Sequence, residues 1–327
     1  MKKIILGIHG LGNKPPEKVL KKWWEKAIRE GLKNAGYPQL FFKFELAYWA
    51  QYLHPQPLSP KERDKKSPFY IDSPYMPNSA TVAGPPNKFR QKIFSILEKE
   101  MDKIFLKKDM SINFEAIPDL IIRKFFRDLD IYYSADYRDN DDMMFHVKEA
   151  IRNRLAKFLN RHEDKEILLI AHSMGSIIAY DVLARSLSDV PIHTLVTLGS
   201  PLGMPIVMGK FVKEENLPFM TGNKLRTPES VRKYWYNLSD LNDKVAMNHD
   251  LCDDYDENSS HVHVIDRIVY NNYEYDGKGN PHQAYGYLRT PEMAEIVYNF
   301  LTEGRNRFTL WLDQRFATLK AGVGELF

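Results

Sequence analysis

One serine in the middle of the chain lies in a pattern that is typical of a sharp strand-to-helix turn. Residues 171–175 read Ala-His-Ser-Met-Gly and nearly match Gly-x-Ser-x-Gly, in which the serine is held on a strained turn. An apolar run precedes the pattern, and apolar residues at helical spacing follow it. Gly175 leaves room for the helix to pack back, whereas Ala171 exceeds the usual glycine by one methyl group. The pattern predicts Ser173 as a nucleophile; an ordinary turn with a surface serine is the alternative.

A serine hydroxyl attacks efficiently only when a base takes its proton and a third group orients that base. Five histidines follow the serine in the chain: His193, His249, His261, His263 and His282. His282 lies in a long loop between the last expected strand and the last expected helix, where a strand-end loop would present a base. His193 begins an expected strand, and His261 and His263 share one face of another, so core or surface roles explain them better. We therefore predict His282 as the general base.

Two aspartates could orient this histidine. Asp240 and Asp243 both follow the strand expected at residues 233–238, on the same edge of a parallel sheet as the serine. We predict Asp243, which precedes Lys244-Val245, as the acid of the site. Asp240 remains the alternative, and either aspartate could instead cap the turn.

Acyl transfer also requires backbone N–H groups that bind the negative charge on the reacting oxygen. Met174 follows the serine at the start of a helix, where N–H groups and a partial positive charge point outward. Leu11 lies in a glycine-rich loop after the first expected strand and is predicted as the second donor. This loop matches neither the dinucleotide-binding nor the Walker phosphate-binding pattern. The residues expected to support the two turns are His9, Gly10, Gly12, His172 and Gly175.

One acidic segment has residue types that can bind a metal: His249, Cys252, Asp253, Asp254, Asp256 and Glu257. Its spacing fits no zinc or EF-hand pattern, so we interpret the segment as a solvated acidic loop. We expect neither a metal nor a cofactor, because the predicted chemistry uses side chains and water alone.

The composition is that of an ordinary globular enzyme. Charged residues make up 27% of the 327 residues, and the net charge of +3 comes from interspersed cations and anions. Nothing therefore indicates a nucleic-acid partner. The single cysteine, Cys252, excludes an internal disulfide, and the first apolar run is too short for a signal peptide. No stretch approaches the roughly 20 apolar residues of a membrane span. We expect a cytoplasmic protein, with peripheral membrane contact left open.

Expected strands and helices alternate along the chain, which predicts a mostly parallel, doubly wound sheet covered by helices on both faces. The strands are expected at residues 3–8, 41–48, 167–170, 194–198, 233–238 and 261–269. Helices are expected after Pro16, from about Asp141 to Phe158, from Ser176, and from Pro291 to Leu301. Residues 206–230 read as a polar, less regular excursion.

The whole chain, 1–327, reads as one domain with an insertion at 51–130. Residues 55–86 contain eight of the 19 prolines, and two amphipathic helical stretches follow them. We interpret 51–130 as a helical cap or lid over the site; the alternative is that these helices pack against the sheet. The tail, 305–327, is expected to be helical.

These motifs together resemble the α/β-hydrolase superfamily, in particular lipase- and esterase-like enzymes with an Ala/Gly-His-Ser-Met-Gly turn. The matching segments are residues 9–12, 171–175, 198–201, 243–245 and 280–282. The resemblance implies a serine hydrolase that cleaves carboxylic esters of a small or lipid-like substrate through an acyl-enzyme. An acyltransferase with the same residues, or a binding module that retains the fold without catalysis, are the alternatives.

Overall fold

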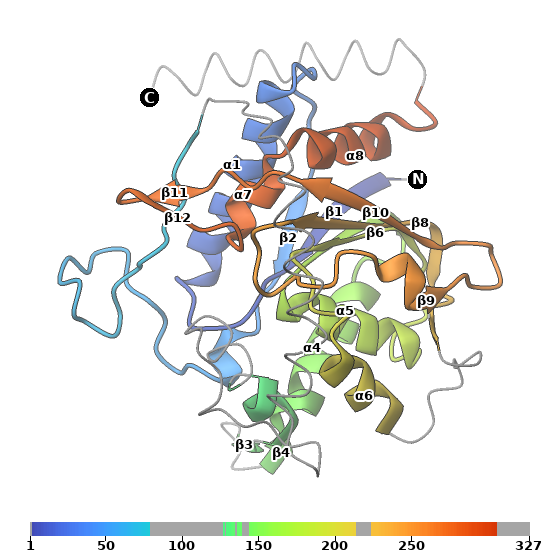
Figure 1. Cartoon of the computed structure of the whole chain (residues 1–327), viewed down its shortest axis with the longest axis horizontal. Coiled ribbons are helices and arrows are strands. Elements are labelled where there is room, and N and C mark those ends of the chain that lie inside the picture. The colour runs from blue at the N-terminus through green and yellow to red at the C-terminus, as the bar shows by residue number, and fades with distance from the viewer. Residues whose placement is uncertain are drawn as a thin grey trace.

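The computed structural model describes residues 2–78, 127, 129–134, 136–138, 144–213 and 224–305. Six strands form its main sheet, in the order β10–β8–β6–β5–β1–β2 (Figure 1). All neighbouring pairs are parallel. The strands are β1 (Lys2–Ile8), β2 (Phe44–Ala47), β5 (Lys165–His172), β6 (Ile192–Leu198), β8 (Val231–Asp240) and β10 (Val264–Val269). The predicted mostly parallel sheet is thus confirmed.

Helices cover both faces of this sheet. On one face lie α1 (Glu17–Asn34), α7 (Ala284–Leu288) and α8 (Pro291–Thr302), and on the other lie α4 (Val147–Asn160) and α5 (Met174–Ala184) (Figure 1). Side chains alternate along each strand, so Ile5 and Leu168 pack with the first group of helices. Leu6 and Leu169 pack with the second group. The apolar runs of the strands are therefore buried on both sides, as a doubly wound sheet requires.

The smaller elements connect this framework. Short strand pairs are β3 (Asp136–Arg138) with β4 (Met144–His146), β7 (Leu225–Arg226) with β9 (Tyr255–Asp256), and β11 (Glu274–Tyr275) with β12 (Lys278–Gly279). Single 3-10 turns cover Ala50–Tyr52 and Leu251–Asp253, and α6 covers Pro205–Lys213. No helix among the described residues is long and apolar enough to cross a membrane.

Several predicted boundaries were wrong. The helix expected from about Asp141 begins at Val147, because residues 144–146 pair with β3 instead. His261 and His263 precede β10 rather than share a strand face, since the Asn258 side chain accepts the Ser260 and Val262 N–H groups in a turn. The excursion expected at 206–230 includes most of α6, whose buried Val207 and Phe211 give it an apolar face.

Most of the predicted insertion lies outside the described residues. Of 51–130, the structure describes 51–78, 127, 129 and 130, and of the tail only Arg305. The described part of the insertion contacts the main domain, because the Tyr75 hydroxyl and the Asn78 N–H both donate to Glu30 on α1. At the other end, Leu129 is buried in the core beside α4 and α5. The cap function remains a prediction.

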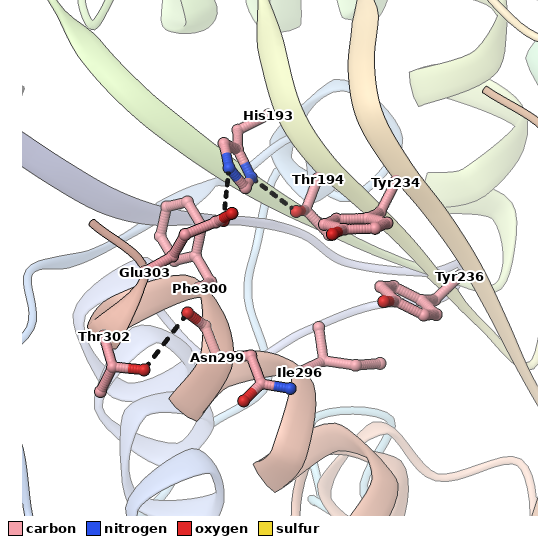
Figure 2. Close-up of a pocket in the computed structure, with 9 residues that line it drawn as sticks. All are labelled: His193, Thr194, Tyr234, Tyr236, Ile296, Asn299, Phe300, Thr302 and Glu303. Carbon is pink, nitrogen blue, oxygen red and sulfur yellow. Dashed lines mark hydrogen bonds and ion pairs between the residues drawn. The ribbon is translucent and has the colours of Figure 1, made fainter. Parts of the chain in front are cut away.

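A cavity of about 320 Å³ lies at the amino ends of β6 and β8, under the last turns of α8 (Figure 2). Its walls carry the rings of Tyr234, Tyr236, Phe300 and His193, together with several other polar groups. The lining residues are His193, Thr194, Tyr234, Tyr236, Ile296, Asn299, Phe300, Thr302 and Glu303. Parallel strands run from this cavity toward the opposite edge of the sheet, where their carboxyl ends carry the residues predicted to react.

Candidate active site

Ser173 lies on the sharp turn between β5 and α5. Its φ of 53° and ψ of −127° are an uncommon conformation for a residue with a side chain. The turn is held by a 2.9 Å hydrogen bond from the Ser173 N–H to the Leu198 carbonyl. A Cβ atom on Gly175 would lie 2.6 Å from the Ile8 carbonyl oxygen, so only glycine lets the helix pack this closely against β1. The strained turn predicted from the pattern is therefore present around this serine.

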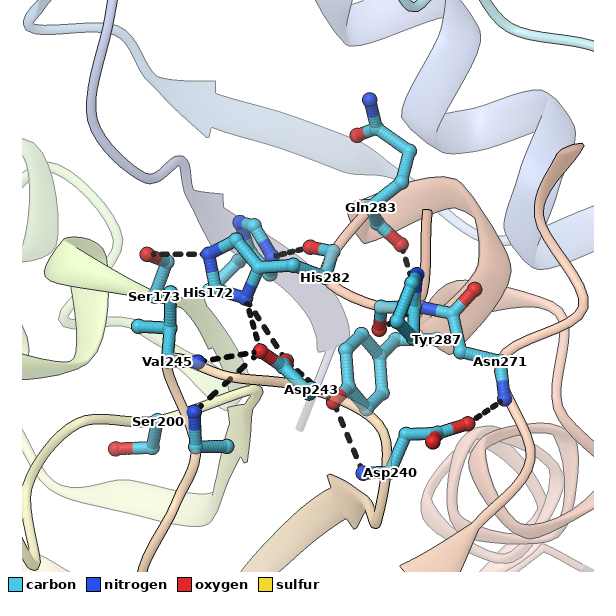
Figure 3. Close-up of polar contacts among 12 residues, drawn as sticks. His172, Ser173, Ser200, Asp240, Asp243, Val245, Asn271, His282, Gln283 and Tyr287 are labelled. Atoms are coloured by element: carbon cyan, nitrogen blue, oxygen red, sulfur yellow. Dashed lines mark hydrogen bonds and ion pairs between the residues drawn. The ribbon is translucent and has the colours of Figure 1, made fainter. Parts of the chain in front are cut away.

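The structure brings together the three side chains that were predicted to react (Figure 3). Ser173 Oγ lies 2.9 Å from His282 Nε2. On its other side, His282 Nδ1 lies 2.8 Å from Asp243 Oδ2. Because a carboxylate can only accept, Nδ1 carries the hydrogen of the neutral ring, and Nε2 is free to accept the serine hydroxyl proton. The arrangement can therefore activate the hydroxyl as a nucleophile.

Asp243 is buried and fully partnered. Its carboxylate also accepts hydrogen bonds from the Val245 N–H, at 2.9 Å, and from the Tyr287 hydroxyl, at 2.7 Å. Burial alone would raise the pKa of Asp243, but the attraction of His282 and these hydrogen bonds outweigh it and lower the pKa. The carboxylate is therefore ionised at neutral pH, as the partner of a histidine base must be.

Asp240, the alternative acid, has different partners. Its carboxylate accepts the Asn271 N–H at 2.6 Å and the Asn242 N–H at 2.7 Å, and it makes no hydrogen bond to His282. Burial raises the pKa of Asp240 despite these bonds. The geometry thus pairs the histidine with Asp243, while Asp240 organises the loop that follows β8.

The loop that carries His282 is held on both sides by Asn271, a residue that the sequence did not single out. Its side-chain amide donates to the Pro281 carbonyl at 2.8 Å and to the Gln283 carbonyl at 2.9 Å. The backbone N–H of Asn271 is in turn bonded to Asp240. An asparagine after a strand is too common to predict such a role, because the role depends on contacts 10 and 12 residues away.

His172 supports the same loop from the turn. Its Nε2 lies 2.8 Å from the His282 carbonyl oxygen, to which it must donate. Burial, together with the nearby His282, holds the pKa of His172 well below its ordinary value, so the ring is neutral. The predicted supporting role of His172 thus has a defined contact.

The glycine-rich loop after β1 lies directly against the serine. A Cβ atom on Gly10 would lie 2.7 Å from Ser173 Cβ. His9 fixes this loop, since its Nδ1 lies 2.8 Å from the Gly10 carbonyl and its Nε2 accepts the Trp49 N–H at 3.1 Å. Burial lowers the pKa of His9 to about 3, so the ring is neutral and its Nδ1–H donates. Leu11 follows in this loop, next to the Gly10 contact.

Gly199, between β6 and the Ser200 turn, was not predicted as a site residue. Its φ of +53° favours glycine, and a Cβ atom there would lie 2.6 Å from Asp243 Oδ2 and 3.2 Å from His282 Nδ1. Residues 198–201 are among the segments that carry the resemblance to α/β-hydrolases, but Gly199 itself has no expected role there. Its signal was the Gly-Ser-Pro that follows a buried strand, which marks a turn at the same edge of the sheet.

The other histidines lie elsewhere. His193 is at the amino end of β6, about 17 Å along the strand from Leu198 at its carboxyl end, and pairs with Glu303 at 3.0 Å. His261 is exposed and pairs with Glu257. His249 is half-buried in the loop after Asp243, and burial lowers its pKa. Among the described residues none of them contacts Ser173.

The acidic segment around Cys252 is organised by hydrogen bonds. Asp266 accepts the Leu251 and Cys252 N–H groups, and Asp254 accepts the Asn248 side-chain amide. Within the part of the chain that the structure describes, no three His, Cys, Asp or Glu residues are grouped as a metal site would need.

Comparison with known proteins identifies relatives of part of the chain. Residues 123–216, which include the turn at Ser173, match the family described as PGAP1-like alpha/beta domain. A segment of 85 residues is 29% identical to the GPI inositol-deacylase of Drosophila melanogaster. That alignment covers 23% of this chain and only 9% of the relative. The resemblance to α/β-hydrolases that the motifs indicated is therefore confirmed, with the region before β5 through α6 as its basis.

Proposed function

Because residues 123–216 match a PGAP1-like alpha/beta domain, we propose that this protein is a serine hydrolase that cleaves carboxylic esters through an acyl-enzyme. The observation that carries the proposal is the contact series from Ser173 Oγ through the His282 ring to Asp243, with distances of 2.9 and 2.8 Å. The strained turn that presents the serine supports it independently. In this proposal Ser173 is the nucleophile, His282 the base and Asp243 the acid.

In the first half-reaction, Ser173 Oγ forms a bond to the ester carbonyl carbon as its proton passes to His282 Nε2. The resulting imidazolium is stabilised by Asp243, which remains ionised. The tetrahedral intermediate then collapses, the bond to the alcohol oxygen breaks, and His282 returns the proton to that oxygen. The products are a free alcohol and an acyl group on Ser173.

The negative charge of the tetrahedral intermediate requires donors next to the serine. Met174 is the first residue of α5, so its N–H has no acceptor inside the helix. Leu11 belongs to the loop whose Gly10 contacts the serine. We propose these two N–H groups as the oxyanion hole, with the positive end of α5 adding to the stabilisation.

In the second half-reaction, water replaces the alcohol. His282 removes a proton from the water, the hydroxide oxygen bonds to the acyl carbon, and collapse of the intermediate returns the proton to Ser173. The acid product leaves and the free enzyme is restored. The steps use only side chains, backbone N–H groups and water, so the chemistry requires no cofactor.

A lipid-like ester is the substrate class that we propose. The relative in Drosophila is named a GPI inositol-deacylase, a name that denotes removal of an acyl group from an inositol. Its name favours ester over amide chemistry and a lipid over a small polar substrate. The length of the acyl chain is left to experiment.

Turnover of p-nitrophenyl esters of graded acyl length, measured with the full chain and with Ser173→Ala, tests the proposal. We expect hydrolysis by the full chain and its loss in the variant. An acceptor alcohol added to the reaction identifies an acyltransferase if it becomes acylated faster than the acid is released. A folded chain without turnover on any ester would favour the binding-module alternative.

A further inference from the structure

One hydroxyl that contacts Asp243 takes no part in the proton transfers described above. Tyr287 lies on α7 and its side chain is fully buried. Its hydroxyl is 2.7 Å from Asp243 Oδ2 and 3.0 Å from the Asp240 backbone nitrogen (Figure 3). It therefore joins the carboxylate that faces His282 to the end of β8.

We propose that Tyr287 is a positioning residue of the site, which fixes the Asp243 carboxylate and takes up part of its charge, so that the carboxylate keeps its orientation toward the His282 ring. This inference rests on the proposed function. It assigns to Tyr287 a role through the aspartate and no contact with the substrate.

The direction of the hydrogen bonds follows from the chemistry of the groups. The Asp240 N–H can only donate, so it occupies a lone pair of the Tyr287 oxygen. The hydroxyl hydrogen is then directed to Asp243, which as a carboxylate can only accept. Burial and the neighbouring Asp243 raise the pKa of Tyr287 well above its ordinary value, so the hydroxyl keeps this hydrogen at neutral pH.

The two carboxylate oxygens of Asp243 are held from different sides. Oδ1 accepts the Val245 N–H and Oδ2 accepts the Tyr287 hydroxyl, while His282 Nδ1 lies 2.9 Å from Oδ1 and 2.8 Å from Oδ2. Without the hydroxyl, Oδ2 keeps the His282 ring as its donor but loses the second one. The Asp240 N–H also loses the acceptor that it has in the native chain. The carboxylate then gains freedom to rotate and carries more charge toward the imidazole.

The pH dependence of the site has a predictable direction. A hydrogen bond to a carboxylate favours its charged form without favouring a proton on its neighbour. Without that bond, the more basic Asp243 stabilises the protonated ring of His282, so the pair must reach a higher pH before the base is neutral. The other titratable groups that face this pair are Asp240, His172, His249 and, through His172, Lys14.

The test is Tyr287→Phe, with Tyr285→Phe as the matched control. Tyr285 lies on the same short helix and is buried, but its hydroxyl makes no hydrogen bond to Asp240 or Asp243. For Tyr287→Phe we expect kcat on a p-nitrophenyl ester to fall about tenfold, the effect of one hydrogen bond, with KM within about twofold. The acid limb of the pH–rate profile should move upward by about half a unit or more. Tyr285→Phe should change neither.

An unchanged kcat and pH profile in Tyr287→Phe would overturn the inference, and so would equal changes in Tyr285→Phe. The His282 Nδ1–H proton, observed by NMR in the full chain at low temperature, provides a readout that needs no turnover. Its chemical shift should move in Tyr287→Phe and stay in Tyr285→Phe; no movement would also overturn the inference. If Ser173→Ala retains full turnover while the proton does move, the proposed reaction fails and the positioning contact stands.

Discussion

Two histidines in this molecule lie between a hydroxyl and a carboxylate. His282 connects Ser173 with Asp243 at 2.9 and 2.8 Å, and His193 connects Thr194 Oγ1 with Glu303 at 2.8 and 3.0 Å. The distances are almost the same, yet only the first arrangement is proposed to react. A hydroxyl, a histidine and a carboxylate at these distances are therefore not sufficient for a serine hydrolase site.

The backbone around the two hydroxyls makes the difference. Ser173 lies on a strained turn at a helix N-terminus, with the Gly10 loop against it. Thr194 lies within β6, where its backbone pairs with β5 and β8 and leaves no N–H group for an oxyanion. Glu303 also contacts Lys233, which draws its charge away from the ring, whereas Asp243 is held by donors that orient it.

Removing each hydroxyl should give the largest contrast. Ser173→Ala should lower kcat/KM for an ester by about ten-thousandfold or more, because the covalent route is lost. Thr194→Val, which keeps the buried shape, should leave kcat/KM within about threefold. Similar losses of activity in the two variants, with both still folded by circular dichroism, would contradict the proposed difference between the two hydroxyls.

Removing each ring should give the next contrast. His282→Gln should lower kcat by about a thousandfold, since the serine loses its base, and added imidazole should restore part of it. His193→Gln should change kcat by less than about threefold. Equal losses in the two variants would place the base elsewhere.

The two hydrogen bonds by which the Asn271 side chain holds the His282 loop, here called the clamp, should contribute less to kcat than Ser173 and His282 do. Asn271→Asp keeps the shape but turns the amide donor into an oxygen that faces the Pro281 and Gln283 carbonyls. We expect kcat to fall about ten- to hundredfold, because the loop shifts away from its position.

The neighbouring Asn272 provides the control for this clamp. Its Oδ1 accepts Arg289 Nε, and Asn272→Asp keeps that acceptor. Turnover in Asn272→Asp should stay within about threefold of the full chain. If Asn271→Asp behaved in the same way, the clamp would have no part in the site.

The smallest expected effect concerns stability rather than turnover. Burial lowers the pKa of His193 in the folded chain, although Glu303 partly offsets the shift. The unfolded chain therefore binds this proton more readily, and stability that is present above about pH 6.5 is lost as the pH falls below that value. His193→Gln removes this contribution.

Urea unfolding at pH 7.5 and pH 5.5 measures this effect. The free energy of unfolding should fall less in His193→Gln than in the full chain over this range. An equal fall in both proteins would show that His193 binds its proton alike in the folded and unfolded chains.

The sequence was most informative where the physical requirement is local. The turn at Ser173 needs small neighbours and a buried strand before it, and these leave a readable pattern. Gly175 and the apolar runs of β1 and β5 are also local features, and they correctly predicted the parallel sheet and the sheet edge at which the strands end. The position of His282 and Asp243 in loops after strands favoured them over the other histidines and Asp240. Their contact with each other is seen only in the three-dimensional structure.

The contacts that hold the site could not be read in this way. Asn271, Tyr287 and Gly199 act across separations that no local pattern records, and each is a common residue for a loop or helix. The sequence predicts the start of α4 wrongly because the pairing of β4 with β3, another non-local contact, competes with helix formation at residues 144–146. Long-range contacts therefore limited how much of the site and of the fold could be predicted from the sequence.

The most direct test of the central claim is the reaction of the full chain with an alkyl fluorophosphonate, located by mass spectrometry. Attack by an activated serine forms an oxygen–phosphorus bond and releases fluoride. We predict a single adduct on Ser173 that is absent in Ser173→Ala and slowed in His282→Gln, with Thr194 unmodified. A folded chain that acquires no adduct, or acquires one at another residue, would contradict the account.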